Sequence, residues 1–148
     1  MNARALRRFE LALPNDPYII NTTTFQLASD QHEWRTGRID VATTTITLPK
    51  ANGSGAEIWL ATGIIAVSQV IQTSGSDKLV GVIDIGATAS TNKNVFAGAG
   101  TAVKVTLNGS TQGGAEIGDQ LFFTDLKAAV WMVTGWLLGS GSIVTPFS

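Results

Sequence analysis

The single histidine of this 148-residue chain, His32, is the only residue on which a Ser-His-Asp hydrolase site could be built. It lies in a polar stretch, residues 28–38, and the sequence contains no Gly-x-Ser-x-Gly motif that would expose a nucleophilic serine. Ser54 does lie between two glycines, but a Gly-Ser-Gly triplet beside Asn52 is typical of a hairpin turn. We therefore interpret His32 as a solvated loop residue without a catalytic role.

Paired carboxylates could hydrolyse glycosidic bonds without a histidine. Most acidic residues beyond residue 50 flank predicted turns, where Asp and Glu commonly bond backbone amides or face water. Asp84 is the exception, because it lies between Ile83 and Ile85 in an apolar strand, and we expect it on an outer face or at a subunit interface. The sequence thus predicts no catalytic residues and no enzymatic activity. The acidic residues considered are Glu57, Asp77, Asp84, Glu116, Asp119 and Asp125.

Cofactor and metal chemistry finds little support in the sequence. The chain contains no cysteine, which excludes thiol nucleophiles, disulfides and cysteine-based zinc sites. Two glycine-rich stretches, residues 98–100 and 113–114, match neither a phosphate loop nor a dinucleotide-binding fingerprint, and they fit hairpin ends. We therefore predict no cofactor and no metal ligands.

The low charge content limits the classes of partner that the chain could bind. Only 14% of residues are charged while 44% are hydrophobic, and a monomer with so few charges would have difficulty covering its surface. We therefore expect a homo-oligomer that buries much of its surface against other subunits. The net charge of −1 predicts no nucleic-acid partner. No apolar run approaches the roughly 20 residues of a membrane helix, and residues 1–13 lack the apolar core of a signal peptide, so we expect a soluble protein made in the cytoplasm.

The charges divide the chain into two predicted parts. All five arginines lie in the first 38 residues, and all five lysines lie from residue 50 onward. We predict an extended N-terminal arm and connector over residues 1–40 and a β-domain over residues 41–148. Residues 2–13 predict one short helix that ends before Pro14, and residues 18–27 suit an extended chain. The arm is predicted to dock on a partner through Arg4, Arg7, Arg8, Phe9 and Leu13, with a solvated, disordered terminus as the alternative.

The elements that must position any site are predicted to be strands. From residue 41 onward, short apolar runs alternate with turns rich in Gly, Asn, Asp and Ser, which is typical of an all-β sandwich or barrel, jelly-roll or β-tulip-like. Around Val105, apolar and polar residues alternate with the period of a strand. No long helical pattern interleaves with these runs, which argues against a parallel α/β sheet, and no internal repeat has a fixed period.

Three of the four tryptophans, Trp59, Trp131 and Trp136, fall in predicted strands. Packing in the core is the simplest interpretation of a strand tryptophan. A subunit interface or a platform that stacks on sugars is the functional alternative, because an indole combines a large apolar surface with a polar N–H group. We assign all three to a subunit interface.

Several segments, in their order along the chain, resemble a recurring pattern in head decoration (cement) and head-fibre proteins of tailed bacteriophages. The resemblance covers residues 43–148 and leaves the first 40 residues uncovered. The segments are TITLP at 45–49, GSGA at 53–56, LVGVI at 79–83, VTLNG at 105–109, VWMVTG at 130–135, GSG at 139–141 and TPFS at 145–148.

This resemblance implies a β-rich, homotrimeric structural protein of the virion with no catalytic residues. It implies that the chain binds the major capsid protein on the outer capsid surface, where neighbouring capsomers meet, and stabilises the head. A receptor- or glycan-binding module of a phage fibre or tail is the alternative, motivated by the tryptophans. A glycan-depolymerising enzyme is a third hypothesis with less support, because it needs two carboxylates in one groove.

Overall fold

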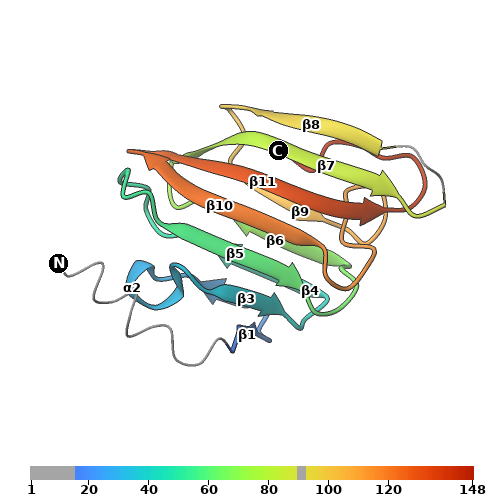
Figure 1. The fold of residues 1–148 in the computed structure, drawn as a ribbon, viewed down its shortest axis with the longest axis horizontal. Coiled ribbons are helices and arrows are strands. Elements are labelled where there is room, and N and C mark those ends of the chain that lie inside the picture. Colours follow the sequence, from blue (N-terminus) through green and yellow to red (C-terminus); the bar gives the residue numbers. More distant parts are fainter. Residues whose placement is uncertain (1–15, 90–92) are drawn as a thin grey trace.

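The computed structural model describes residues 16–89 and 93–148, which form two β-sheets packed face to face (Figure 1). The predicted all-β sandwich is confirmed. In spatial order, the seven-stranded sheet contains β1 (Tyr18–Ile20), β3 (Thr36–Ile39), β5 (Glu57–Thr62), β10 (Gln120–Lys127), β11 (Val130–Gly139), β7 (Lys78–Ala87) and β8 (Lys93–Ala99). The four-stranded sheet contains β2 (Thr24–Gln26), β4 (Thr43–Thr47), β6 (Ser68–Gln72) and β9 (Lys104–Leu107), and one short helix, α2 (Ser29–His32), follows β2.

The first six strands alternate between the two sheets. Strands β1, β3 and β5 pair in parallel in the larger sheet, and β2, β4 and β6 do so in the smaller one. Parallel strands need a crossover connection, which is usually a helix. Here each crossover is instead a strand of the opposite sheet, so residues 18–72 wind as a flattened coil. This parallel pairing without helices was not predicted from the sequence.

The later strands complete both sheets around one hydrophobic core. Strand β10 pairs antiparallel with β5 and β11, and β7 pairs in parallel with β11 and antiparallel with β8. Side chains alternate along β11, so Trp131 and Val133 point into the core while their neighbours do not. The indole N–H of Trp131 donates to the carbonyl oxygen of Pro49 at 3.1 Å, which satisfies its one polar atom.

The boundary predicted near residue 40 is wrong for residues 18–39. Ile20, Leu27 and Ile39 belong to the same buried core as Phe123 and Trp131, and β1 to β3 are strands of both sheets. The distribution of arginines and lysines along the sequence does not mark a domain boundary, because such a boundary depends on where apolar side chains pack. The predicted helix over residues 2–13 and the docking residues Arg4, Arg7, Arg8, Phe9 and Leu13 lie outside the described residues.

The C-terminal residues run along the edge strand β9. The backbone N–H of Val103 donates to the carbonyl oxygen of Ser148 at 2.9 Å, and that of Thr106 donates to Pro146 at 2.9 Å. Phe147 packs partly buried against the core, near the backbone of Gly98 on β8. The tail thus covers one edge of the smaller sheet and fills the gap between the sheets on that side. No helix among the described residues has the length and apolar character to span a membrane.

Candidate functional site: the outer face of the seven-stranded sheet

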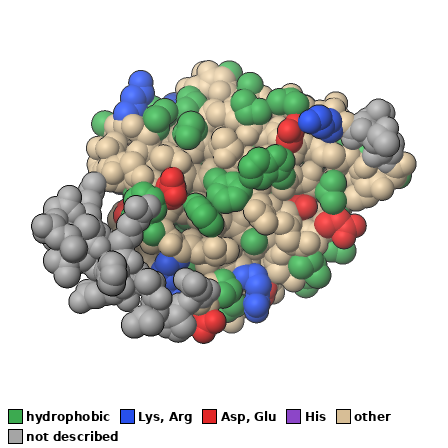
Figure 2. Space-filling view, viewed as in Figure 1, with side chains coloured by type: hydrophobic (Ala, Val, Ile, Leu, Met, Phe, Trp, Pro, Cys, Tyr) green, Lys and Arg blue, Asp and Glu red, His purple; other side chains and the backbone are tan. Residues whose placement is uncertain are grey.

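The seven-stranded sheet has one face in the core and one face toward solvent. We call the solvent side the outer face; Figure 2 shows it, with hydrophobic side chains gathered near its centre. The strand registers place its side chains in transverse rows, because residues paired across strands project to the same side. One row contains Thr36, Trp59, Phe122, Thr134, Val82 and Ala97, and the next contains Arg38, Ala61, Gln120, Trp136, Asp84 and Val95.

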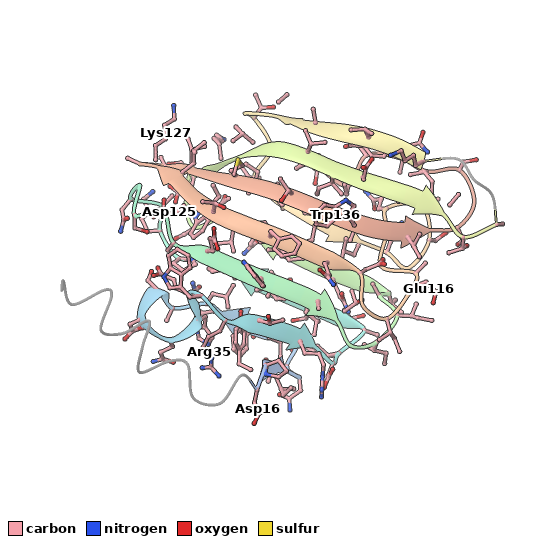
Figure 3. All side chains as sticks on the ribbon, viewed as in Figure 1. Asp16, Arg35, Glu116, Asp125, Lys127 and Trp136 are labelled. Atoms are coloured by element: carbon pink, nitrogen blue, oxygen red, sulfur yellow. The ribbon has the colours of Figure 1, made fainter. Side chains whose placement is uncertain are left out.

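Three aromatic rings form the centre of the outer face, and we call them the aromatic ladder. The ring centroids of Trp59 and Phe122 are 5.2 Å apart, and those of Phe122 and Trp136 are 5.7 Å apart. Both contacts are edge-to-face, a geometry that aromatic pairs favour and that holds the rings in place. Trp59 and Trp136 nevertheless remain 44% and 62% exposed. Trp136 stands on the near side of the sheet in Figure 3.

Aliphatic side chains extend this surface toward β7 and β8. Val82, Leu138 and Val95 are all exposed. Single exposed apolar residues are ordinary on protein surfaces, but contiguous apolar patches mark sites where another molecule binds. The outer face is therefore the strongest candidate for an interaction site on this chain.

Asp84 lies within this apolar surface, beside Trp136 and Val95. Its side chain is 30% exposed, which confirms the predicted position on an outer face. Oδ2 lies 3.9 Å from Nζ of Lys93, while Oδ1 is buried without a hydrogen-bond partner. An unsatisfied buried oxygen is costly and calls for an explanation. Because Oδ1 is buried, only the exposed part of this side chain could orient a molecule bound on the outer face.

Three carboxylates that are buried, those of Asp77, Asp119 and Asp125, hold loops. Asp125 at the end of β10 accepts hydrogen bonds from the backbone N–H groups of Asn52, Gly53 and Ser54 and from Oγ of Ser54, at 2.7 to 3.1 Å. Burial raises the pKa of Asp125, but the hydrogen bonds from Ser54, Gly53 and Asn52 outweigh it and hold that pKa below its usual value. Asp125 thereby fixes the loop between β4 and β5, the glycine-rich turn that the sequence predicted.

Asp77 and Asp119 act in the same way. Asp77 accepts a hydrogen bond from the backbone N–H of Ala51 at 2.7 Å and pairs with Lys50. Oδ2 of Asp119 accepts from the N–H groups of Gly114 and Leu138, both at 2.9 Å. Burial raises the pKa of Asp119 to about 6, against the effect of these hydrogen bonds. The predicted role of the acidic residues at turns is confirmed for all three, and their carboxylates are engaged in structural bonds.

His32 is not the solvated loop residue that the sequence predicted. It is only 9% exposed, and its ring packs edge-on against Tyr18 and Phe25 with centroid distances of 4.7 and 5.4 Å. Its Nδ1 atom lies 2.9 Å from the backbone N–H of Ala28. Burial lowers the pKa of His32, which favours the neutral ring. The prediction failed because helix α2 folds this polar stretch back onto β1 and β2.

The three tryptophans assigned to a subunit interface separate into two groups. Trp59 and Trp136 are exposed on the outer face, where another molecule could contact them. Trp131 is 1% exposed, so its assignment to an interface is wrong. Trp131 and Trp136 are an odd number of positions apart on β11, and a strand must point such residues to opposite faces. The sequence therefore already held the signal that separates them.

Phe122 is the member of the aromatic ladder that sequence reasoning missed. It stands next to Phe123, and successive strand residues face opposite sides, so one of the two had to lie on the outer face. Its importance comes from its pairing with Trp59 on the neighbouring strand, which is more than sixty residues away in sequence. Cross-strand register of this kind is not visible in a single sequence.

A shallow hollow at the end of β5 is a weaker candidate. Arg38, Asp40, Gly63, Ile64 and Ile117 contribute to its lining. The guanidinium of Arg38 already bonds Asp40 in a fork, with Nη2 to Oδ2 at 2.6 Å, so its charge is compensated within the chain. Across the described ranges, 16–89 and 93–148, no group of three or more His, Asp or Glu residues could hold a metal ion.

Comparison with known proteins adds nothing to this picture: no protein-family model, no curated protein and no solved structure matches the chain.

Proposed function

We propose that this chain is a structural subunit of a tailed-phage particle that decorates the head, binding the major capsid protein on the outer capsid surface between capsomers and stabilising the shell. The observation that carries the proposal is the outer face, a rigid apolar surface with exposed tryptophans. The resemblance of residues 43–148 to decoration and head-fibre proteins supplies the biological setting. In this setting the chain is made in the host cytoplasm and acts on the virion.

The chemistry of the aromatic ladder supports a protein partner. Buried aromatic anchors contribute most of the binding free energy at protein interfaces, and truncating such an anchor costs about 2 kcal/mol or more. Within the described residues, the row from Trp59 through Phe122 to Thr134 and Val82 carries no charged side chain. Such a surface loses little free energy from desolvation when another apolar surface covers it.

Preorganisation supports the same function. The rings of the ladder lie on three paired strands, and the carboxylates of Asp125 and Asp119 fix the loops at the ends of those strands. A surface that is already ordered loses less conformational entropy on binding. Self-association of the chain would add avidity, because linked copies of a weak contact bind with a raised effective concentration. The arginines at positions 4, 7 and 8 would add a second contact with the capsid.

The test is to add the purified protein back to phage heads that lack it. We expect the wild type to bind and to raise the temperature at which the heads release DNA. A Trp59→Ala, Trp136→Ala double variant should bind at least tenfold more weakly and protect correspondingly less. Val67→Ala is the matched control, because Val67 is an exposed apolar residue outside the seven-stranded sheet. Heads with unchanged heat stability after decoration contradict the proposal.

A receptor- or glycan-binding module of a fibre or tail is the second candidate. The observation that favours it is the position of Asp84, a carboxylate beside the exposed indole of Trp136. Sugars bind proteins through an apolar ring face together with acceptors for hydroxyl groups. Saturable binding on a glycan array that is lost in Trp136→Ala, with no binding to heads, would favour this function over capsid decoration.

A further inference from the structure

Edge strands expose unpaired backbone N–H and C=O groups, and proteins usually shorten, charge or cover them. Three of the four sheet edges in the described residues follow this rule. Strands β1 and β2 have three residues each. Strand β9 is covered by the C-terminal residues, where Lys104 and Ser148 exchange backbone hydrogen bonds at 3.0 and 3.1 Å.

The fourth edge, β8, differs from the others. It is seven residues long and pairs only with β7, so no described residue covers its other side, the free upper edge of the sheet in Figure 1. Its one charged residue, Lys93, is at its start, and the strand contains no proline. Its outward side chains, Val95, Ala97 and Ala99, are apolar, and two of them are small. A long edge whose only charge lies at its first residue is a template for another strand.

We propose that β8 pairs antiparallel with β8 of a second copy of this chain, which joins the seven-stranded sheets of two copies edge to edge. A two-fold axis perpendicular to the sheet brings the same strand edge of both copies together and keeps every outward side chain on the outer face. With Phe96 at the axis, Val95 of each copy lies opposite Ala97 of the other. Lys93 then lies opposite Ala99 at the two far ends of the pair, so the like charges are kept apart.

This pairing also extends the candidate interaction site. On one copy, Trp136, Asp84 and Val95 are successive members of one row. Across the joint, the row continues with Ala97 and then Val82 of the second copy, whose own row leads to Phe122 and Trp59. The two aromatic ladders therefore face the same direction on one continuous sheet. A second copy fits this edge because β8 is complementary to itself in the antiparallel register. Each Val95 lies opposite the small side chain of Ala97, and each Lys93 lies opposite Ala99 at an end of the pair.

The first experiment changes the edge of β8 and measures mass by analytical ultracentrifugation over a range of concentrations. A single strand pair is a small interface, so we expect a concentration-dependent dimer. Ala97→Lys places two like charges close to the joint and should weaken the dimer at least tenfold. Ala97→Thr, an uncharged residue suited to strands, should leave it within about threefold of wild type. Val67→Lys, a change at another exposed position that lies outside the edge, should have no effect, and melting curves verify that all variants fold.

The second experiment tests the geometry. The natural chain has no cysteine, so introduced thiols report without background. Directly opposed residues in an antiparallel pair have Cα atoms about 4.5 to 5.5 Å apart, within the range of a disulfide. A mixture of Val95→Cys and Ala97→Cys chains should form mixed disulfide dimers under mild oxidation, and a mixture of Val95→Cys and Val67→Cys should not.

Three results overturn the inference: a wild-type monomer at every concentration, a dimer or trimer that Ala97→Lys does not weaken, or equal cross-linking in both mixtures. The inference does not rest on the proposed function. Loss of head binding in the Trp59→Ala, Trp136→Ala variant with β8 pairing intact would separate the two claims. A β8 dimer with no affinity for heads would end the proposed function and leave this inference standing.

Discussion

The two outward surfaces of this sandwich share one fold but differ in chemistry. On the four-stranded sheet, the outward rows carry hydroxyl and amide groups, with Gln26, Thr47, Gln72 and Lys104 paired across four strands. Their polar groups bond one another and the backbone: Nε2 of Gln72 donates to Oγ1 of Thr47 at 3.1 Å. The polar side chains of this surface form hydrogen bonds within the chain, and a surface of this kind is well solvated.

The outer face of the seven-stranded sheet has the opposite character. Its centre is the aromatic ladder, and its one embedded carboxylate, Asp84, leaves an oxygen without a partner. The core needs only the inward half of each strand, so the outward half of both sheets is free to vary. This difference is the reason that we propose a binding role for the outer face of the seven-stranded sheet and none for the outward surface of the four-stranded sheet.

The sharpest way to test this comparison uses two tryptophans of the same strand. Trp131→Ala should reduce the free energy of unfolding by about 3–5 kcal/mol, because it empties a large core site and leaves the Pro49 carbonyl without its donor. Trp136→Ala should change it by less than about 1 kcal/mol, yet weaken head binding. Urea denaturation measures the first effect, and the add-back assay measures the second. Similar losses of stability in both variants would remove the distinction between inward and outward residues.

The sequence could predict that inward and outward residues alternate along each strand, but it could not predict which strands pair with one another. Period-two patterning and turn residues were sufficient to predict strands and a sandwich, because both are local signals. The coil of residues 18–72 was missed because successive turns differ in length: Tyr18 pairs with Gly37, but Gly37 pairs with Leu60. A repeat of unequal turns leaves no fixed period to detect.

The candidate site was predicted in part for the same reason. Trp59 and Trp136 could be singled out by residue type, whereas Phe122 gains its role only from the register between β5 and β10. The burial of His32 likewise depends on packing between α2, β1 and β2. Contacts between residues far apart in sequence decide these outcomes, and propensity and spacing carry no information about them.

The next prediction concerns the loop that supports the aromatic side of the sandwich. Asp125→Asn removes the charge that four donors share and should reduce the free energy of unfolding by about 2 kcal/mol at pH 7. Because the folded-state pKa of Asp125 is lowered, its contribution is present above the unfolded pKa of about 4 and is lost as the pH falls through the folded value. Chemical denaturation between pH 2 and 7 should therefore show a shallower acid limb in Asp125→Asn. An equally steep limb in both proteins would argue against this role.

The contribution of Asp119 to the free energy of unfolding should depend on pH in the opposite direction to that of Asp125. Its folded-state pKa is raised to about 6, so the folded protein binds a proton more tightly than the unfolded chain. Stability should consequently fall as the pH rises from about 4 to 6 and stay reduced above that. Asp119→Asn keeps an acceptor for the N–H groups of Gly114 and Leu138 without the buried charge, so it should remove this pH dependence and stabilise the protein at pH 7 by about 1 kcal/mol. Melting temperatures of the wild type and of Asp119→Asn, measured across this pH window, test the prediction. Asp125→Asn is the control, because its stability should change with pH in the opposite direction.

The smallest expected effect is a gain of stability in the hairpin that carries Phe122 and Trp136. Ala129 has a φ of 62° at the turn between β10 and β11, a left-handed conformation that disfavours a side chain. Ala129→Gly relieves that strain but adds conformational freedom to the unfolded chain, so we expect a net stabilisation of about 0.5 kcal/mol. Ala128→Gly, at the neighbouring position without a positive φ, should destabilise instead. Because the register of β10 and β11 holds the ladder in place, Ala129→Gly should leave head binding unchanged; weaker binding despite higher stability would mean that the strain itself shapes the outer face.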